Sequence, residues 1–318
     1  MDVVGHKKIL DFLRAAKDAG RLAHGYLFCG PAGVGKFMVA KKMAAELLGV
    51  DENRFLNHPD VTVLEREIDA KTKKLAKNLS IDQIRGTIHR LNLSSFLDSW
   101  KIAIINDAET LSLPAANALL KTLEEPRDKV MIILISQSRE ALPATICSRL
   151  QVINFTLVSD SEILSGLLNR GMTRETAAEI SRLALGRPGR AIEFLAEPEK
   201  ITEYKERAEW FIKLLKNNLA ARFKMVEEYA GEFGKEEAVS EALGVLDIWN
   251  GVLRDIASSA LGNREAIAHR FLEEKFSAVS RDFGGKILLL KDGLDEARQM
   301  ISANVNYELA FKNIFLKI

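Results

Sequence analysis

Apolar residues in the first half of the chain fall into short continuous runs, and segments of helical period separate these runs. Short apolar runs bounded by turn-forming residues are typical of strands that are buried on both faces, as in parallel sheets. Residues 1–157 are therefore expected to form an α/β domain with a five-stranded parallel sheet. The expected strands are Tyr26–Cys29, Val61–Leu64, Lys101–Ile105, Val130–Ile135 and Val152–Phe155.

Local signals mark two helices of this domain. Ser80 and Gln83 have the spacing of a capping box, in which each side chain bonds the backbone N–H of the other, and they predict a helix that runs to about Leu93. Pro114 is favoured in the first turn of a helix, and the helix that it begins must end before Pro126.

Beyond about residue 158 the strand-like runs disappear and the pattern becomes helical. Three short helices are expected in a small domain at 158–197, and a boundary is expected around Pro198. An all-helical domain is expected at 198–318, where the stripe through Trp249 indicates a bundle core or a subunit interface. The three short helices are Ser159–Asn169, Thr173–Leu185 and Pro188–Leu195.

Two charged features are candidates for contact with DNA, and for both we favour simple exposure to water. Segment 65–78 is rich in lysine, interrupts the α/β pattern and predicts an exposed hairpin or loop. Arg85 and His89 stand one turn apart on the helix that Ser80 caps.

A glycine-rich loop follows the first expected strand. Gly30, Gly33, Gly35 and Lys36 have the spacing of a P-loop, and an apolar helical stripe follows them, which is the order that a P-loop requires. In such a loop, backbone N–H groups and a helix N-terminus face phosphate oxygens, and the lysine reaches the outer phosphates. Phe37 stands where active NTPases carry the hydroxyl that holds Mg²⁺, so the chain is expected to have lost its own hydrolysis.

P-loop NTPases also need an acidic site at the end of a neighbouring strand. If the third strand ends at Ile105, Asn106 occupies the metal-supporting position and Asp107 the position that orients the attacking water. A frame shifted by one residue makes Asp107 the metal residue. Together with Phe37, this doubtful acidic pair favours loss of hydrolysis.

Composition narrows the class of protein. The chain has 318 residues, 47% of them hydrophobic, and a formal charge of +1, so no overall field draws it onto nucleic acid. Runs long enough to span a membrane and the apolar core of a signal peptide are both missing, which predicts a cytoplasmic protein without a membrane partner. Cys29 and Cys147 suit reduced, buried thiols, and the five histidines are scattered, so no metal site is expected.

Three strings resemble one family of replication proteins. They are residues 21–31, residues 58–60 and residues 115–126. Over residues 1 to about 195 the sequence resembles the delta-prime subunits of the bacterial DNA polymerase III clamp loader, which are AAA+ proteins. The resemblance implies an AAA+ P-loop domain at 1–157, a small helical lid domain at 158–197 and an all-α collar domain at 198–318.

The same resemblance implies partners and a residue that acts on one of them. The partners are the other subunits of a hetero-pentameric ring, the sliding clamp, and primed DNA through the assembled complex. Arg149 matches the arginine of the Ser-Arg-Cys motif, which enters the ATP site of the neighbouring subunit, whereas Leu150 departs from that motif at the cysteine. A planar, permanently charged guanidinium suits such an arginine finger, because it pairs with phosphate oxygens as charge builds during transfer.

The resemblance also implies a nucleotide site within the chain. Val4 falls near the adenine, and Ser136 and Gln137 fall where sensor residues contact the γ-phosphate. Gly189 stands where active relatives carry a second sensor arginine, for which Arg187 or Arg190 is a possible substitute. We expect ATP or ADP to bind through Val4, Gly30, Gly33, Gly35 and Lys36 without productive Mg²⁺-dependent hydrolysis. No zinc is expected, because segment 49–61 lacks the cysteines that many relatives carry there.

These features favour a scaffold subunit that donates Arg149 in trans while its own site is damaged. The first alternative is a hydrolysis-competent AAA+ motor subunit of a clamp loader. A free-standing P-loop kinase or transferase is the second alternative, and it leaves the helical C-terminus without a role. In the segment with Lys121, Glu124 and Glu125, a stabilised helix end or a contact between subunits is favoured over an acid–base site.

Overall fold

The computed structural model describes residues 3–67, 76, 78–93, 99–231, 233, 238–303 and 305–316. The chain divides into two compact units, Met1–Ala191 and Ile192–Ile318. This division differs from the boundaries at 157 and 197 that the sequence suggests, which remain predictions. Most of the lysine-rich segment 65–78 lies outside the described residues.

The first unit contains a five-stranded sheet in the order β2-β3-β4-β1-β5, and every pairing in it is parallel. All residues of β1, β3 and β4 are buried, as expected for β-branched and other apolar runs covered on both faces. The predicted sheet is therefore confirmed, with strand ends within one residue of those expected. The strands are β1 Gly25–Cys29, β2 Val61–Leu64, β3 Lys101–Ile105, β4 Val130–Ser136 and β5 Gln151–Asn154.

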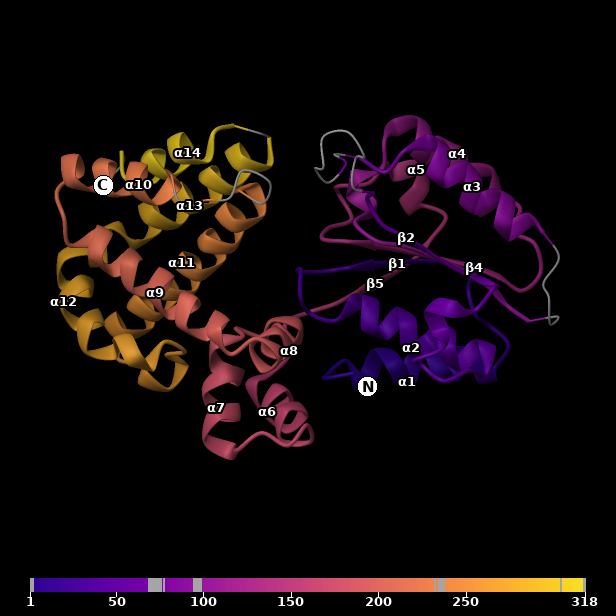
Figure 1. The fold of residues 1–318 in the computed structure, drawn as a ribbon, viewed down its shortest axis with the longest axis horizontal. Coiled ribbons are helices and arrows are strands. Elements are labelled where there is room, and N and C mark those ends of the chain that lie inside the picture. The colour runs from indigo at the N-terminus through magenta and orange to yellow at the C-terminus, as the bar shows by residue number, and fades with distance from the viewer. Residues whose placement is uncertain are drawn as a thin grey trace. The chain divides into compact units, whose positions relative to one another are not determined.

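Helices cover both faces of this sheet (Figure 1). On one face α1 Lys7–Asp18 and α2 Lys36–Leu48 enclose one apolar core, and on the other α3 Ile81–Asn92, α4 Leu113–Glu124 and α5 Ala144–Cys147 enclose a second. The capping box predicted for α3 is present. Ser112 caps α4, so Pro114 lies in the first turn of that helix, as predicted. Short 3₁₀ turns at Phe55–Asn57 (η1) and Ala108–Thr110 (η2) follow α2 and β3.

The three predicted short helices are present as α6 Asp160–Leu168, α7 Arg174–Leu183 and α8 Pro188–Ala196. Ser159 and Thr173 cap the first two of them. The break between the two compact units falls inside α8.

The described residues of the second unit form helices joined by turns and loops, and none of them is in a strand. Its longest helix, α11, carries the predicted stripe, of which Leu246, Trp249 and Leu253 are buried and Leu243 and Asn250 are half-buried. The helices are α9 Glu199–Leu215, α10 Leu219–Gly231, α11 Ala238–Ala260, α12 Glu273–Phe283, α13 Ile287–Ser302 and α14 Tyr307–Ile314, with 3₁₀ turns η3 Arg264–Ala266, η4 Arg270–Leu272 and η5 Gly284–Lys286.

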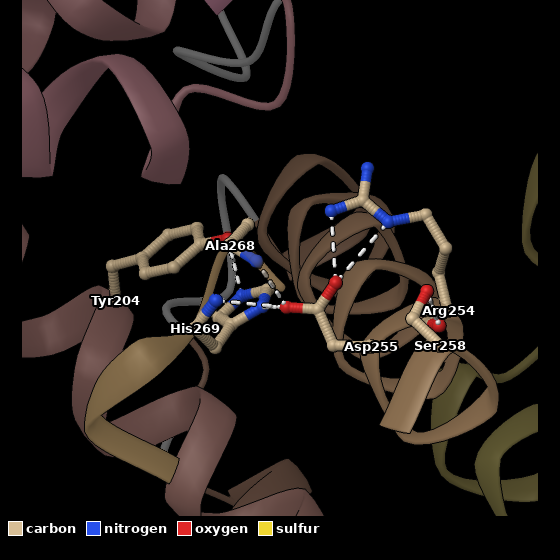
Figure 2. A network of polar contacts seen from close by, with 6 residues as sticks. All are labelled: Tyr204, Arg254, Asp255, Ser258, Ala268 and His269. Atoms are coloured by element: carbon tan, nitrogen blue, oxygen red, sulfur yellow. Dashed lines mark hydrogen bonds and ion pairs between the residues drawn. The ribbon is translucent and has the colours of Figure 1, made fainter. Parts of the chain in front are cut away.

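A polar network lies in the core of this unit. The carboxylate of Asp255 accepts hydrogen bonds from the backbone N–H groups of Ala268 and His269 at 2.9 and 2.7 Å, and the ring of His269 lies 2.7 Å from the same oxygen (Figure 2). The other ring nitrogen of His269 lies 2.8 Å from the hydroxyl of Tyr204, and Arg254 pairs with the second oxygen of Asp255. The network therefore joins α9, α11 and the loop before η4.

In the described part of the chain, no helix has both the length and the apolar character that crossing a membrane requires.

Candidate functional site

The glycine loop leaves the carboxyl end of β1 in a conformation that glycine favours. Gly30, Gly33 and Gly35 have φ values of 149°, 76° and 103°. A Cβ at Gly30 would lie 2.3 Å from the carbonyl oxygen of Phe155, so a side chain has no room there. Since Gly35 is the N-cap of α2, the loop presents a helix N-terminus, and these residues fit a phosphate group.

Lys36 begins α2, and its side chain folds back over the loop. Its ammonium group donates to the carbonyl oxygens of Gly30 and Pro31 at 2.5 and 2.8 Å. Burial lowers the pKa of Lys36, and the negative charge of Glu109 opposes that shift. To contact phosphate oxygens, the ammonium would have to give up these carbonyl partners.

Val4 lies in a cavity of about 470 Å³ between the N-terminal segment and α6. The glycine at 166 allows this approach, because a Cβ there would lie 2.6 Å from the Val4 side chain. His6 connects the segment to the glycine loop, since its Nε2 lies 2.8 Å from the carbonyl oxygen of Val34. Burial lowers the pKa of His6. Through His6, the structure thus links the segment that carries Val4 to the glycine loop, and a role of Val4 in nucleotide binding stays a prediction.

Phe37 and the acidic pair are each held by other parts of the protein. The half-buried ring of Phe37 packs against the core cluster under α1 and α2, and a benzyl group cannot bind Mg²⁺. The amide of Asn106 donates to Glu65 at 3.0 Å, and Asp107, at a φ of 47°, pairs with Arg66 at 3.3 Å. Both candidate metal positions therefore have partners in the segment that follows β2.

Glu109 is a further candidate residue of this site, and the sequence patterns did not indicate it. Its Oε2 atom is buried and has no hydrogen-bond partner among the described residues. Its carboxylate is also the largest of the charges that raise the pKa of Lys36 against the effect of burial. The available signal was a third polar residue just after β3, at the carboxyl edge of the sheet where the glycine loop also lies.

Position 189 lies directly on the glycine loop. The N–H of Gly189 donates to the carbonyl oxygen of Gly33 at 2.7 Å, and a Cβ at Gly189 would lie 2.9 Å from that oxygen. A sensor arginine at 189 therefore does not fit this arrangement. Arg187 is close as well, since its side chain lies 3.5 Å from the Cβ position of Gly33.

The remaining residues of the predicted nucleotide site fall into two environments. Ser136 is buried beneath the loop, where its carbonyl oxygen accepts from the N–H of Gly30, and Gln137 is exposed. Cys29 and Cys147 are buried free thiols, as predicted. The described residues contain no group of three or more His, Cys, Asp or Glu side chains arranged to hold a metal.

Arg149 lies at the amino end of the parallel strands, whereas the glycine loop lies at their carboxyl end. It comes just before β5, whose first residue pairs with Tyr26, and its carbonyl oxygen lies 3.7 Å from the Cβ position of Gly25 at the start of β1. The glycine loop follows the other end of β1, about 13 Å away at ~3.3 Å per residue. The Arg149 side chain therefore lies far from the glycine loop of its own chain.

The guanidinium of Arg149 is oriented by three groups. One nitrogen donates to the carbonyl oxygen of Thr145 at 2.7 Å and to the hydroxyl of Ser148 at 3.3 Å. The other forms an ion pair with Glu124 at the end of α4. Arg85 and His89, the candidates for DNA contact on α3, are exposed.

Residues 5–159 match the family described as DNA polymerase III, delta subunit. The chain is 23% identical to the delta' subunit of DNA polymerase III from Bacillus subtilis over 98% of this chain and 95% of that protein. It is 36% identical to the delta' subunit from Pseudomonas aeruginosa, over 40% of this chain and 41% of that protein. It is also 34% identical to the tau subunit from Bacillus subtilis, over 53% of this chain and only 31% of that protein.

Two solved structures are similar to this chain at lower identity. One is a DNA polymerase III gamma subunit-related protein from Thermotoga maritima, which is 19% identical over 95% of this chain and 96% of that chain, with a TM-score of 0.47. Another is a variant of RuvB from Thermotoga maritima, which is 17% identical over 85% of this chain and 88% of that chain, with a TM-score of 0.43.

Proposed function

Because residues 5–159 of this chain belong to the DNA polymerase III delta subunit family, we propose that it acts as a clamp-loader subunit of the delta-prime type. In this role it joins a hetero-pentameric ring in the cytoplasm, and the ring places a sliding clamp on primed DNA. Arg149 completes the ATP site of a neighbouring subunit, and the chain does not hydrolyse ATP itself.

The position of Arg149 carries this proposal. An arginine near a P-loop serves its own nucleotide, whereas Arg149 lies at the amino edge of the sheet and the glycine loop at the carboxyl edge. A guanidinium in this position can contact a phosphate only when the ATP site of a neighbouring subunit lies against the amino end of these strands. The similarity to a delta' subunit along nearly the whole chain supports the same role.

The state of the chain's own site supports a role without hydrolysis. The glycine loop and Lys36 provide N–H groups and positive charge for the phosphates of ATP or ADP. Magnesium would contribute charge neutralisation and orientation of the γ-phosphate in an active site, but Phe37 offers it no oxygen. Asn106 and Asp107 are engaged by Glu65 and Arg66, so acidic support for the metal is weak as well.

The test is a reconstituted ring that carries Arg149→Ala, Arg149→Lys or Arg174→Ala. Arg174 is an exposed arginine at the start of α7 and serves as the matched control. Arginine fingers accelerate phosphoryl transfer by about 10³–10⁵, so DNA-stimulated ATPase should lose nearly all the turnover of the one site that Arg149 serves. Arg149→Lys should not rescue it, because an ammonium lacks the planar fork. Undiminished turnover in a ring that assembles with Arg149→Ala would disprove the role.

A hydrolysis-competent motor subunit is the second candidate function. The three loop glycines, Lys36 and the nearby carboxylate of Glu109 favour it. In that case the purified chain should hydrolyse ATP alone, and Lys36→Ala should abolish the activity. The proposed scaffold should show no turnover that depends on Lys36.

A further inference from the structure

A cavity of about 560 Å³ lies in the second unit among α9, α10 and the start of α11, apart from the nucleotide site. Binding pockets of proteins commonly have volumes of about 300–1,000 Å³, so it has room for one long side chain and part of its backbone. The proposed function uses none of the residues that line it.

One wall of the cavity is aromatic and rigid. Trp210 stacks on Tyr229 with ring centroids 4.2 Å apart and planes 24° apart, and Tyr229 meets Phe233 edge-on at 5.2 Å. Trp210 also stacks at 5.6 Å on Trp249, which is fully buried in the core of the unit. Because the core holds the partners of the stack, the aromatic wall is already formed before any ligand binds.

The rim of the cavity is acidic. Glu203, Glu206 and Glu228 are exposed there, and Glu241 is half-buried. Arg207 and Lys213 are the lining cations, and Lys224 lies 3.9 Å from Glu228. Four glutamates against three cations leave a surplus of one negative charge. Arg207 lies 3.7 Å from Glu241 and offsets that carboxylate.

The spacing along α9 places these groups over the aromatic wall. Glu203, Glu206 and Trp210 follow one another by three and four residues, which puts them on one face of a helix. Glu228 neighbours Tyr229 on α10. Carboxylates from two helices therefore flank a pair of stacked rings.

An aromatic face beneath carboxylates attracts a cation in two ways, by the quadrupole of the rings and by ion pairing. A guanidinium suits both, since it is planar, stacks on indole and forks toward carboxylate oxygens. We infer that this cavity binds an arginine side chain from a basic segment of a protein partner, packed against the Trp210–Tyr229 pair between Glu206 and Glu228. The acidic rim repels phosphate, which argues against nucleic acid as the occupant.

The test uses the full chain with ¹⁵N-labelled tryptophan, so that NMR resolves the indole N–H signals, and Trp210→Phe identifies the signal of Trp210. The probes are capped Gly-Arg-Gly peptide and the same peptide with citrulline, which keeps the shape of arginine but has no charge. The arginine peptide should shift the Trp210 signal in a saturating titration with a Kd on the order of 1 mM. The citrulline peptide should bind at least about fivefold more weakly.

Glu206→Gln combined with Glu228→Gln tests the rim without disturbing the aromatic wall. This double substitution should raise the Kd of the arginine peptide by about threefold to tenfold, because two exposed ion pairs are lost. Glu227→Gln, at the neighbouring position of α10, is the matched control and should change nothing. The inference is wrong if the arginine peptide fails to saturate, if citrulline binds equally well, if the two rim substitutions have no effect, or if a single-stranded oligonucleotide shifts the same signal more strongly.

Discussion

Glu124, the last residue of α4, forms an ion pair with the guanidinium of Arg149, which lies just before β5. The same guanidinium is also bonded to the carbonyl oxygen of Thr145 and the hydroxyl of Ser148. Arg149 is thus held on three sides, while its side chain stays about one-third exposed. For this helix end the sequence favoured either a stabilised helix or a contact between subunits, and in the structure its last residue orients the proposed arginine finger.

We predict that Glu124→Gln reduces the ATPase of the reconstituted ring by about twofold to fivefold, because the guanidinium loses its charged partner and samples more orientations. The free energy of unfolding should change by less than about 1 kcal/mol, since an exposed ion pair contributes little to stability. Steady-state kinetics of the ring and urea denaturation of the chain measure the two effects.

Glu125→Gln is the matched control, because the neighbouring carboxylate is exposed and is not among the groups that the Arg149 guanidinium contacts in the described structure. It should behave as the unsubstituted ring does. Equal rates for the two glutamine variants would show that Glu124 does not position Arg149, whereas the result with Arg149→Ala would still decide the arginine finger itself.

Gly30→Ala should destabilise the first unit by roughly 2–4 kcal/mol, as measured by urea denaturation. The added Cβ meets the carbonyl oxygen of Phe155 at 2.3 Å, and the backbone is at a φ that a side chain disfavours. Gly86→Ala, in the interior of α3 with open space around its Cβ, should instead stabilise by about 0.5–1 kcal/mol. If Gly30→Ala lowered the free energy of unfolding only slightly, the loop would have relaxed away from β5.

Much of this site follows from local patterns. The loop glycines and Lys36 are recognisable because the P-loop is a contiguous spacing between a strand and a helix. The capping box of α3 and the first turn of α4 likewise depend on residues within four positions of each other. Such short-range patterns can be recognised from the sequence without knowledge of the tertiary structure.

Contacts between residues that are far apart in the sequence could not be predicted from local patterns, and only the structure reveals them. The pairings of Asn106 with Glu65 and of Asp107 with Arg66 depend on β2 lying next to β3 in the sheet. The close approach of Gly189 to Gly33 joins positions far apart in sequence. Such contacts are set by tertiary packing. The resemblance to the family therefore implies that Gly189 stands where active relatives carry an arginine, but it does not reveal that a side chain at 189 would meet Gly33.

Asp255→Asn should cost about 3 kcal/mol of stability at pH 7, because it breaks a fully buried pair with His269. Burial raises the pKa of Asp255, but hydrogen bonding and charge from His269 outweigh it, so the net pKa lies below the usual 3.8. A carboxyl whose pKa is lower in the folded state stabilises fully above the unfolded pKa and loses this contribution as the pH falls.

The difference in free energy of unfolding between the original chain and Asp255→Asn should therefore be constant from pH 7 to about 5 and shrink below about pH 4. Denaturant titrations across this range measure it. Asp247→Asn is the control on the same helix, where the ion pair with Arg298 is partly exposed and should contribute less than about 1 kcal/mol. If this difference in free energy of unfolding instead grew as the pH falls, the assigned downward shift of the Asp255 pKa would be wrong.

Binding of ATP should depend little on magnesium. The glycine loop supplies backbone N–H groups and Lys36 whether or not a metal is present, while Phe37 offers no ligand and Asn106 and Asp107 are bonded to other side chains. The Kd for ATP, followed by calorimetry, should change by less than about threefold between excess Mg²⁺ and EDTA. Phe37→Thr alone should leave this ratio low, because the acidic support is still missing, whereas Phe37→Thr with Asn106→Asp should raise it. A strong dependence on Mg²⁺ in the original chain would show that the metal has another anchor, and Glu109→Gln then tests whether its buried carboxylate is that anchor.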